Sequence, residues 1–364
     1  MGPIKGTWLS LEQKVEILSM TEDAKEKGVS ITRSCAFWMI ERRRVVRWRR
    51  KQNRAESLAN RKPGPRYPLH RLLPAERTAV LEMAKKEAYA DLSHRILAAT
   101  ARDLHLFFVS FSSVYRILRA AHMITMRGIH KAHNGTSLPP VRKELTGPNQ
   151  RWCWDISYLP TYEKGVFLYL YLLLDEYSRK AISWLISWNH TAHEARYLFE
   201  EGLLNENILD LPEDQRPEII NDRGLQMKAK SIKRMCEDHH MPQLFARPRT
   251  PNDNPFVESL FGTVKTAPQY PGRFLDREEA VAYFTRYFPW YNHEHLHSGI
   301  QYVTPEQCHR GLREAIVARR KEQFTQQQRL RKEVNRLRHN ALTGNQGNVI
   351  VNVNRFTACS VMNP

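Results

Sequence analysis

Three acidic residues of this 364-residue chain stand in contexts that suit metal ligands. Asp155 lies within a strongly apolar run, where a buried charge is costly unless it is paired or metal-bound. Asp222 follows a strand predicted over 218–221, and α/β sheets bind ligands at strand ends. Glu258 falls near the first turn of a helix predicted over 255–265. Three such carboxylates predict a site for two Mg²⁺ or Mn²⁺ ions, which would support in-line phosphoryl transfer. The alternative is that all three acids are structural.

The elements that must position these acids belong to a predicted catalytic core at 149–311, where aromatic and aliphatic runs alternate with helical stretches. We expect strands over 152–159, 167–175, 181–188, 218–221 and 243–246, and helices over 191–205, 227–239, 255–265 and 277–291. This order predicts a mixed α/β sheet. Asn254 is positioned to cap the helix that begins with Pro255. Lys265 shares a face with Glu258, roughly 10 Å further along the axis, where it would meet a phosphate or base.

The charge of the chain points to a polyanionic partner. Its net charge is +18 and its pI is about 9.8, and Lys and Arg displace counterions from phosphate backbones. No run reaches the ~20 apolar residues of a membrane span, and we expect no secretory signal. Five scattered cysteines predict a reducing compartment without structural zinc. We expect no nucleotide cofactor, because no phosphate-binding loop motif occurs, and a cytoplasmic location at the bacterial nucleoid.

Residues 1–59 are predicted to form a helix-turn-helix DNA-binding module. Leu11, Val15 and Leu18 have the spacing of a core-facing stripe. The last helix is strongly basic, and the alternative reading is a solvated charged face. Its candidate DNA contacts are Arg43, Arg44, Arg47 and Arg50.

Further modules and linkers flank the core. A basic, proline-rich linker at 60–69 leads to a second helix-turn-helix-like module at 70–125 and a second linker at 126–148. Tyr115 and Arg116 of this module would face DNA, although a plain three-helix bundle fits as well. Residues 312–364 form a basic helix and tail. The apolar stripe Leu330, Val334 and Leu337 could pair with another helix or lie along DNA.

Residues 150–310 resemble the catalytic core of DDE transposases from bacterial insertion sequences, within the retroviral-integrase superfamily and its RNase H-like fold. The matching segments are W-C-W-D-I-S-Y-L at Asp155, L-Y-L-L-L-D-E-Y-S-R-K after it, N-D-R-G at Asp222, P-N-D-N-P-F-V-E-S-L-F at Glu258 and Y-N-H-E-H-L-H from Tyr291. The 35 residues between Asp222 and Glu258 match the family spacing. The resemblance implies that Asp155, Asp222 and Glu258 are the catalytic metal ligands and that Lys265 is the family's basic position.

The resemblance also implies an activity. A metal-activated water would free a 3′-OH at the element end, and this 3′-OH would attack a second phosphodiester. DNA partners would be the element's terminal repeats and the target, held by a homodimer or larger assembly. Two alternatives remain: a metal-dependent nuclease or resolvase that does not join strands, and a catalytically silent DNA-binding protein.

Three further residues are candidates near this site. Arg247 and Arg249 stand in the loop before the Glu258 helix and are expected to contact phosphate. His297, in a cluster with His293 and His295, is expected to make a substrate or structural contact, and the cluster could also be a helix end and turn near DNA.

Overall fold

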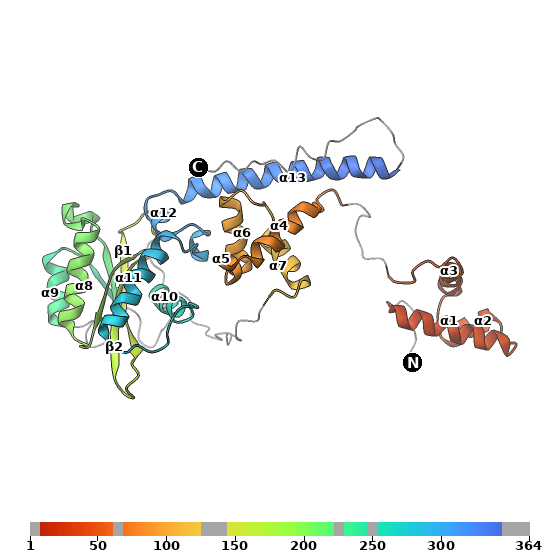
Figure 1. The fold of residues 1–364 in the computed structure, drawn as a ribbon, viewed down its shortest axis with the longest axis horizontal. Coiled ribbons are helices and arrows are strands. Elements are labelled where there is room, and N and C mark those ends of the chain that lie inside the picture. The colour runs from red at the N-terminus through yellow and green to blue at the C-terminus, as the bar shows by residue number, and fades with distance from the viewer. Residues whose placement is uncertain (1–7, 61–67, 125–143, 222–228, 246–253, 344–364) are drawn as a thin grey trace. The chain divides into compact units, whose positions relative to one another are not determined.

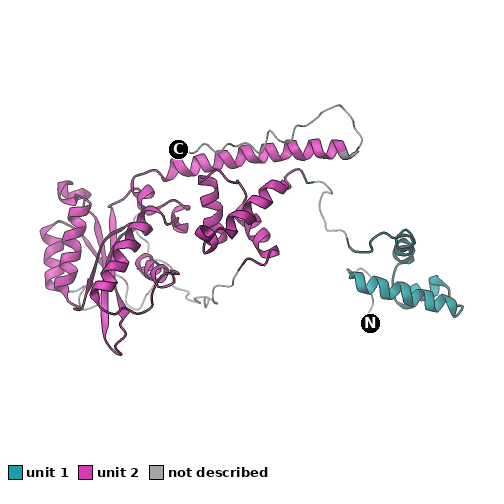
Figure 2. Cartoon of the chain, in the orientation of Figure 1, with its two compact units in different colours: residues 1–68 teal, residues 69–364 magenta. Residues whose placement is uncertain are grey.

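The computed structural model describes residues 8–60, 68–124, 144–221, 229–245 and 254–343. The chain divides into two compact units, Met1–Pro68 and Leu69–Pro364 (Figure 2). Among the described residues, no helix is long and apolar enough to cross a membrane.

The first unit contains α1 (Leu11–Glu26), α2 (Ile31–Phe37) and α3 (Arg42–Asn53). Ser10 and Gln13 form a capping box at the start of α1. The expected core-facing stripe of α1 is confirmed for Leu18, which is 1% exposed, but is wrong for Leu11 and Val15, which are 48% and 46% exposed. Lys14 is instead buried, at 4% exposed. The Nζ of Lys14 donates to the Leu58 carbonyl over 2.7 Å and to Asn60. The segment after α3 therefore covers the Lys14 face of α1, which sets the orientation of the helix.

The second unit begins with a group of short helices. These are α4 (Pro74–Lys85), α5 (Glu87–Ala90), α6 (His94–Asp103) and α7 (Phe111–Ala120). Ser93 and Ser110 accept hydrogen bonds from the first turns of α6 and α7. Val80, Leu97 and Val114 are buried at the centre of the group.

A five-stranded sheet follows. It consists of β1 (Arg151–Pro160), β2 (Phe167–Asp175), β3 (Ala181–Ser187), β4 (Glu218–Asn221) and β5 (Gln243–Phe245). The strand order is β3-β2-β1-β4-β5. Strands β1 to β3 pair antiparallel, whereas β4 pairs parallel with β1 and β5 pairs parallel with β4. This order and these directions are those of an RNase H-like sheet, which confirms the expected mixed-sheet core.

Helices cover both faces of the sheet (Figure 1). The first face packs against α8 (Ala192–Asn205) and α9 (Lys230–Asp238), and the second against α10 (Pro255–Lys265) and α11 (Arg277–His293). Side chains of a strand alternate between faces. Accordingly Trp152 and Trp154 are buried with α8 and α9, while Cys153 and Leu159 are buried with α10 and α11. Short 3₁₀ turns lie at η1 (Ile208–Asp210), η2 (Glu213–Gln215) and η4 (Ser298–Ile300).

The last helices are α12 (Pro305–His309) and α13 (Arg313–Thr343). α13 contacts the helices of residues 69–124, because Arg320 bonds to Asp103 and Arg331 bonds to Glu76. Of the predicted stripe, Val334 is buried. Of the two readings left open for this helix, the structure therefore supports pairing with other helices of the same chain.

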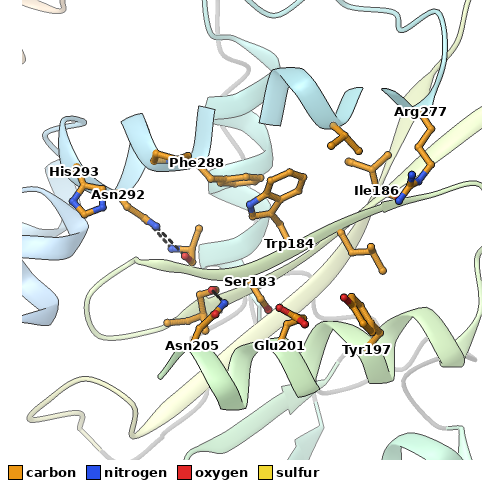
Figure 3. A pocket seen from close by; sticks show the side chains of 15 residues that line it. Ser183, Trp184, Ile186, Tyr197, Glu201, Asn205, Arg277, Phe288, Asn292 and His293 are labelled. Atoms are coloured by element: carbon orange, nitrogen blue, oxygen red, sulfur yellow. Dashed lines mark hydrogen bonds between the residues drawn. The ribbon is translucent and has the colours of Figure 1, made fainter. Parts of the chain in front are cut away.

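Strand β3 forms one edge of the sheet, and a groove of about 470 Å³ runs along it between α8 and α11 (Figure 3). Asn292 exchanges two hydrogen bonds with the backbone of Ala181, and Arg277 donates to the Ile186 carbonyl. These side chains satisfy edge groups that would otherwise be open to pairing with another strand.

Candidate active site

Asp155 lies in the middle of β1, opposite Leu172 of β2. It is partly buried, and its Oδ1 accepts a hydrogen bond from the backbone amide of Ile156 over 2.8 Å. By strand alternation its side chain shares a face with Cys153, which is buried with α10 and α11. Asp155 therefore lies on the α10 side of the sheet.

Asn254 occupies the N-cap position of α10, but its side chain makes no capping hydrogen bond. The predicted capping role is therefore wrong. The Nδ2 of Asn254 instead donates to the carbonyl oxygen of Trp154 over 3.1 Å. Asn254 is 2% exposed, and a buried carbonyl needs a donor because it has lost its contact with water. This bond joins the start of α10 to β1 at the residue before Asp155.

Glu258 and Lys265 are exposed residues of α10. Glu258 is in the first turn and Lys265 in the last, while Val257, Leu260 and Val264 are buried against the sheet. Burial lowers the pKa of Lys265, and the negative charge of Asp155 opposes that shift. The ammonium group of Lys265 therefore lies within electrostatic range of the Asp155 carboxylate.

The remaining predicted site residues in this region lie outside the described part of the chain. These are Asp222, Arg247 and Arg249. The last described residue of β4 is Asn221, which is bonded directly to Asp222. Within the described ranges, which do not include Asp222, no group of three His, Cys, Asp or Glu side chains could hold a metal ion. Carboxylate oxygens such as those of Asp155 and Glu258 are the ligand type that Mg²⁺ requires.

The histidines after α11 belong to a turn. The Nδ1 of His297 accepts a hydrogen bond from the Gly299 amide over 3.0 Å, and its backbone bridges to Val303. The His295 ring stacks on Tyr291 with centroids 5.3 Å apart. Burial lowers the pKa of both histidines to about 4. Of the readings considered for His297, these contacts support a structural one.

The four arginines of α3 that are predicted to contact DNA differ in their surroundings. Arg43, Arg47 and Arg50 are exposed and spaced along one face of the helix. The guanidinium of Arg44 lies 5.3 Å from the centroid of the Trp48 ring. The Arg44 side chain thus packs on its own helix rather than extending into solvent.

In α7, Tyr115 and Arg116 contact neighbouring helical residues. The Tyr115 ring lies 5.2 Å from that of His94, between ring centroids. Arg116 is exposed, and its guanidinium donates to the Ser112 carbonyl and to the Ser113 hydroxyl. Both side chains therefore make contacts within the group of helices α4 to α7.

Besides the bond from Asn254 to Trp154, two contacts at the site have no counterpart in the sequence-based expectations. The Trp154 indole Nε1 donates to Asn221 Oδ1 over 2.6 Å. The Arg179 guanidinium lies 3.4 Å from the centroid of the Phe256 ring, two residues before Glu258. For the contact between Trp154 and Asn221, the sequence shows only that a polar residue, Asn221, ends an apolar strand. That feature does not predict which residue binds Asn221.

The core of the chain matches known protein families. Residues 146–251 match a family model described as integrase core domain, and residues 240–305 match a second model of the same description. The putative transposase InsK of insertion sequence element IS150 from Escherichia coli is 24% identical over 191 residues, 52% of this chain and 65% of that protein. The transposase InsF of insertion sequence IS3A, also from Escherichia coli, is 30% identical over 166 residues, 44% of this chain and 54% of that protein. The matches thus span between about half and two thirds of these relatives.

A solved structure of the HTLV-2 integrase catalytic core domain in complex with magnesium is 16% identical and covers 45% of this chain and 97% of its own, with a TM-score of 0.33. Because that score is low, the likeness depends on the family models and the insertion-sequence relatives. Residues 146–305 therefore match the integrase core domain, and the relatives that the chain resembles are transposases of bacterial insertion sequences.

Proposed function

We propose that the chain is an insertion-sequence transposase that binds the ends of its element and catalyses DNA cleavage and strand transfer. The observation that carries the proposal is the hydrogen bond from Asn254 to the Trp154 carbonyl. This bond brings the helix of Glu258 to the strand of Asp155 within an integrase core domain.

In this proposal Asp155, Asp222 and Glu258 bind two Mg²⁺ ions, for which Mn²⁺ can substitute. Bound ions would polarise the phosphodiester and lower the pKa of the attacking oxygen. Asp155 is partly buried, whereas Glu258 is exposed. In this proposal the sheet holds the Asp155 carboxylate in place, and the Glu258 carboxylate faces incoming DNA.

Lys265 is proposed to bind a phosphate of the element end. Its helix places it about two turns beyond Glu258, roughly 10 Å along the axis. Lys265 is an exposed residue as a whole, and the charge of Asp155 opposes the lowering of its pKa. Arg247 and Arg249 are proposed to contact the same DNA backbone.

Recognition of the element ends is proposed for the helical parts of the chain. The exposed face of α3 formed by Arg43, Arg47 and Arg50 offers charges to phosphate oxygens. We propose that α1 to α3 act as a helix-turn-helix module and that α4 to α7 form a second module. Because two DNA ends must be joined to one target, we also propose a homodimer or larger assembly on DNA.

Strand transfer is the test. The protein is incubated with labelled element-end DNA, a target plasmid and Mg²⁺ or Mn²⁺, in parallel with Glu258→Gln and Asp155→Asn. Glu278→Gln is the matched control, because Glu278 is an exposed acid in the first turn of the neighbouring helix α11. We expect joined products from the parent and the control, and none from the two site variants.

Other outcomes would point elsewhere. Cleavage without joining would favour a nuclease or resolvase. Binding of element ends without cleavage in either metal would favour a silent DNA-binding protein. Equal activity in the parent and Glu258→Gln would show that Glu258 is not a metal ligand of the catalytic site.

A further inference from the structure

We propose that Trp154 is a positioning residue that joins the end of β4 and the start of α10 to β1 beside Asp155. This inference rests on the proposed function, since it concerns how the metal ligands of that site are held. Trp154 is 0% exposed and directly precedes Asp155 in β1. It contacts the end of β4 through its indole and the start of α10 through its carbonyl.

The indole contact reaches the segment that carries Asp222. Trp154 Nε1 donates to Asn221 Oδ1 over 2.6 Å, and both residues are 0% exposed. The pairing of β1 with β4 extends as far as Cys153 and Ile220. The side-chain bond therefore continues the contact between the two strands by one residue beyond the backbone pairs. Asn221 is covalently linked to Asp222, so this contact holds the residue that directly precedes the second carboxylate.

The carbonyl contact reaches the segment that carries Glu258. Asn254 Nδ2 donates to the Trp154 oxygen over 3.1 Å from a position that is 2% exposed. Glu258 follows four residues later, which is about one helical turn, or roughly 6 Å, along α10. The start of α10 is thereby held at the position of Trp154 on β1.

Packing holds the Trp154 side chain in place. Its ring meets Phe199 of α8 edge to face, with centroids 5.3 Å apart and planes at 76°. Strand alternation sends Trp154 toward α8 and Asp155 toward α10. The residue thus anchors β1 on one face of the sheet while presenting the carboxylate on the other.

Loss of the indole N–H should disturb ligand geometry more than it disturbs folding. Metal sites tolerate only about 0.5 Å of misplacement. Removing a group that orients metal ligands typically costs about 10–100-fold in metal affinity or activity. Trp154→Phe keeps an aromatic ring against Phe199 and removes the donor to Asn221, together with part of the ring volume.

Trp152→Phe is the matched control. Trp152 lies on the same strand and the same face, is also 0% exposed, and donates its indole N–H to Asn149 Oδ1 over 2.9 Å. Asn149 precedes β1 and adjoins none of the three carboxylates. Both variants therefore lose one indole hydrogen bond made from a buried ring, but only Trp154→Phe loses a bond to the site.

The experiment measures three quantities for the full-length parent and both variants. These are kcat and KM for cleavage of element-end DNA, Mn²⁺ affinity of the DNA-free protein by electron paramagnetic resonance, and Tm. For Trp154→Phe we expect kcat to fall about 10–100-fold, Mn²⁺ affinity to fall and KM to change little. For Trp152→Phe we expect parental kcat and Mn²⁺ affinity, with a Tm loss similar to that of Trp154→Phe.

Asn221→Ala provides a second route should Trp154→Phe not fold, because it removes the acceptor and keeps the ring. It should reproduce the loss of kcat and Mn²⁺ affinity, and the double variant should lose no more than either single variant. The inference is overturned if Trp154→Phe and Asn221→Ala match Trp152→Phe in kcat and Mn²⁺ affinity while the parent is active. A parent that neither cleaves DNA nor binds Mn²⁺ would overturn the proposed function itself, and this inference with it.

Discussion

Arg331 of α13 and Glu76 of α4 form a buried ion pair, although they lie 255 positions apart in the sequence. The Arg331 Nη2 lies 2.7 Å from Glu76 Oε1, and the two residues are 4% and 7% exposed. Arg331 also donates to the carbonyl of Phe108. The C-terminal helix is therefore attached to the helices of residues 69–124 by a charge pair shielded from water.

Arg331→Ala should destabilise the second unit strongly. Removing one partner of a buried ion pair leaves the other charge without compensation and typically costs about 3–5 kcal/mol. Urea denaturation would measure the free energy of unfolding. Arg329→Ala is the control, because Arg329 is an exposed residue of the same helix and should change stability by no more than about 0.5 kcal/mol. Equal losses in the two variants would show that the pair contributes little.

Lys265→Gln should weaken binding of element-end DNA and reduce its dependence on salt. A lysine that contacts phosphate contributes roughly one unit to the slope of log K against log salt concentration. Lys233→Gln is the control, since Lys233 lies on α9 across the sheet and pairs with Glu237 at 3.5 Å. Fluorescence anisotropy between about 50 and 200 mM salt covers the range in which such slopes are resolved. An unchanged slope for Lys265→Gln would argue against the phosphate contact.

Substituting Arg43, Arg47 and Arg50 with Ala should lower the affinity for DNA of any sequence. All three side chains are exposed on one face of α3, and each phosphate contact that is lost should reduce the salt slope by about one unit. Arg49→Ala serves for comparison, because Arg49 lies 3.4 Å from Glu22 in an ion pair within the unit. If Arg49→Ala weakened DNA binding as much as the three other substitutions, the proposed face would be wrong.

Stability should fall as pH falls from about 6.5 toward 4. Burial lowers the pKa of His295 to about 4, compared with roughly 6.5 in an unfolded chain. Between these values the unfolded chain binds more protons, so the free energy of unfolding decreases as pH decreases. His295→Phe keeps a ring against Tyr291 and removes the titrating group. Its urea midpoint should depend less steeply on pH in this window, and a slope equal to that of the parent would contradict the assignment.

Chelation with EDTA should separate DNA binding from catalysis. Binding through arginine and lysine requires no metal, whereas phosphoryl transfer in the proposed site requires the carboxylate-bound ions. We expect element-end DNA to remain bound, cleavage to stop, and excess Mg²⁺ or Mn²⁺ to restore it. Cleavage that persists through dialysis against EDTA would rule out a readily exchanged metal in the reaction.

The secondary structure of the core was largely predictable because its signals are local. The strands at Phe167–Asp175 and Glu218–Asn221 and the helix at Pro255–Lys265 begin and end where hydrophobic runs, turn residues and proline predict. The candidate carboxylates were likewise identified from residue type, context and family resemblance. These features need only a few neighbouring residues to be recognised.

Contacts over long sequence distances were not predictable. Hydrophobic spacing predicted a buried Leu11 and Val15, but the segment at Leu58 covers Lys14 instead. Asn254 has the residue type of a helix cap, yet it bonds to Trp154, 100 residues earlier in the chain. In both cases the side chain forms a hydrogen bond with a residue from a distant segment, and local periodicity does not predict such a partner.

The sequence by itself thus determined which elements form, which acids are candidate ligands and which family the core resembles. Only the tertiary structure decided that Trp154 joins β4 to α10 beside Asp155, and that Arg331 pairs with Glu76. The physical reason is that buried donors, acceptors and charges must find partners, and which partner is within reach depends on how the whole chain packs.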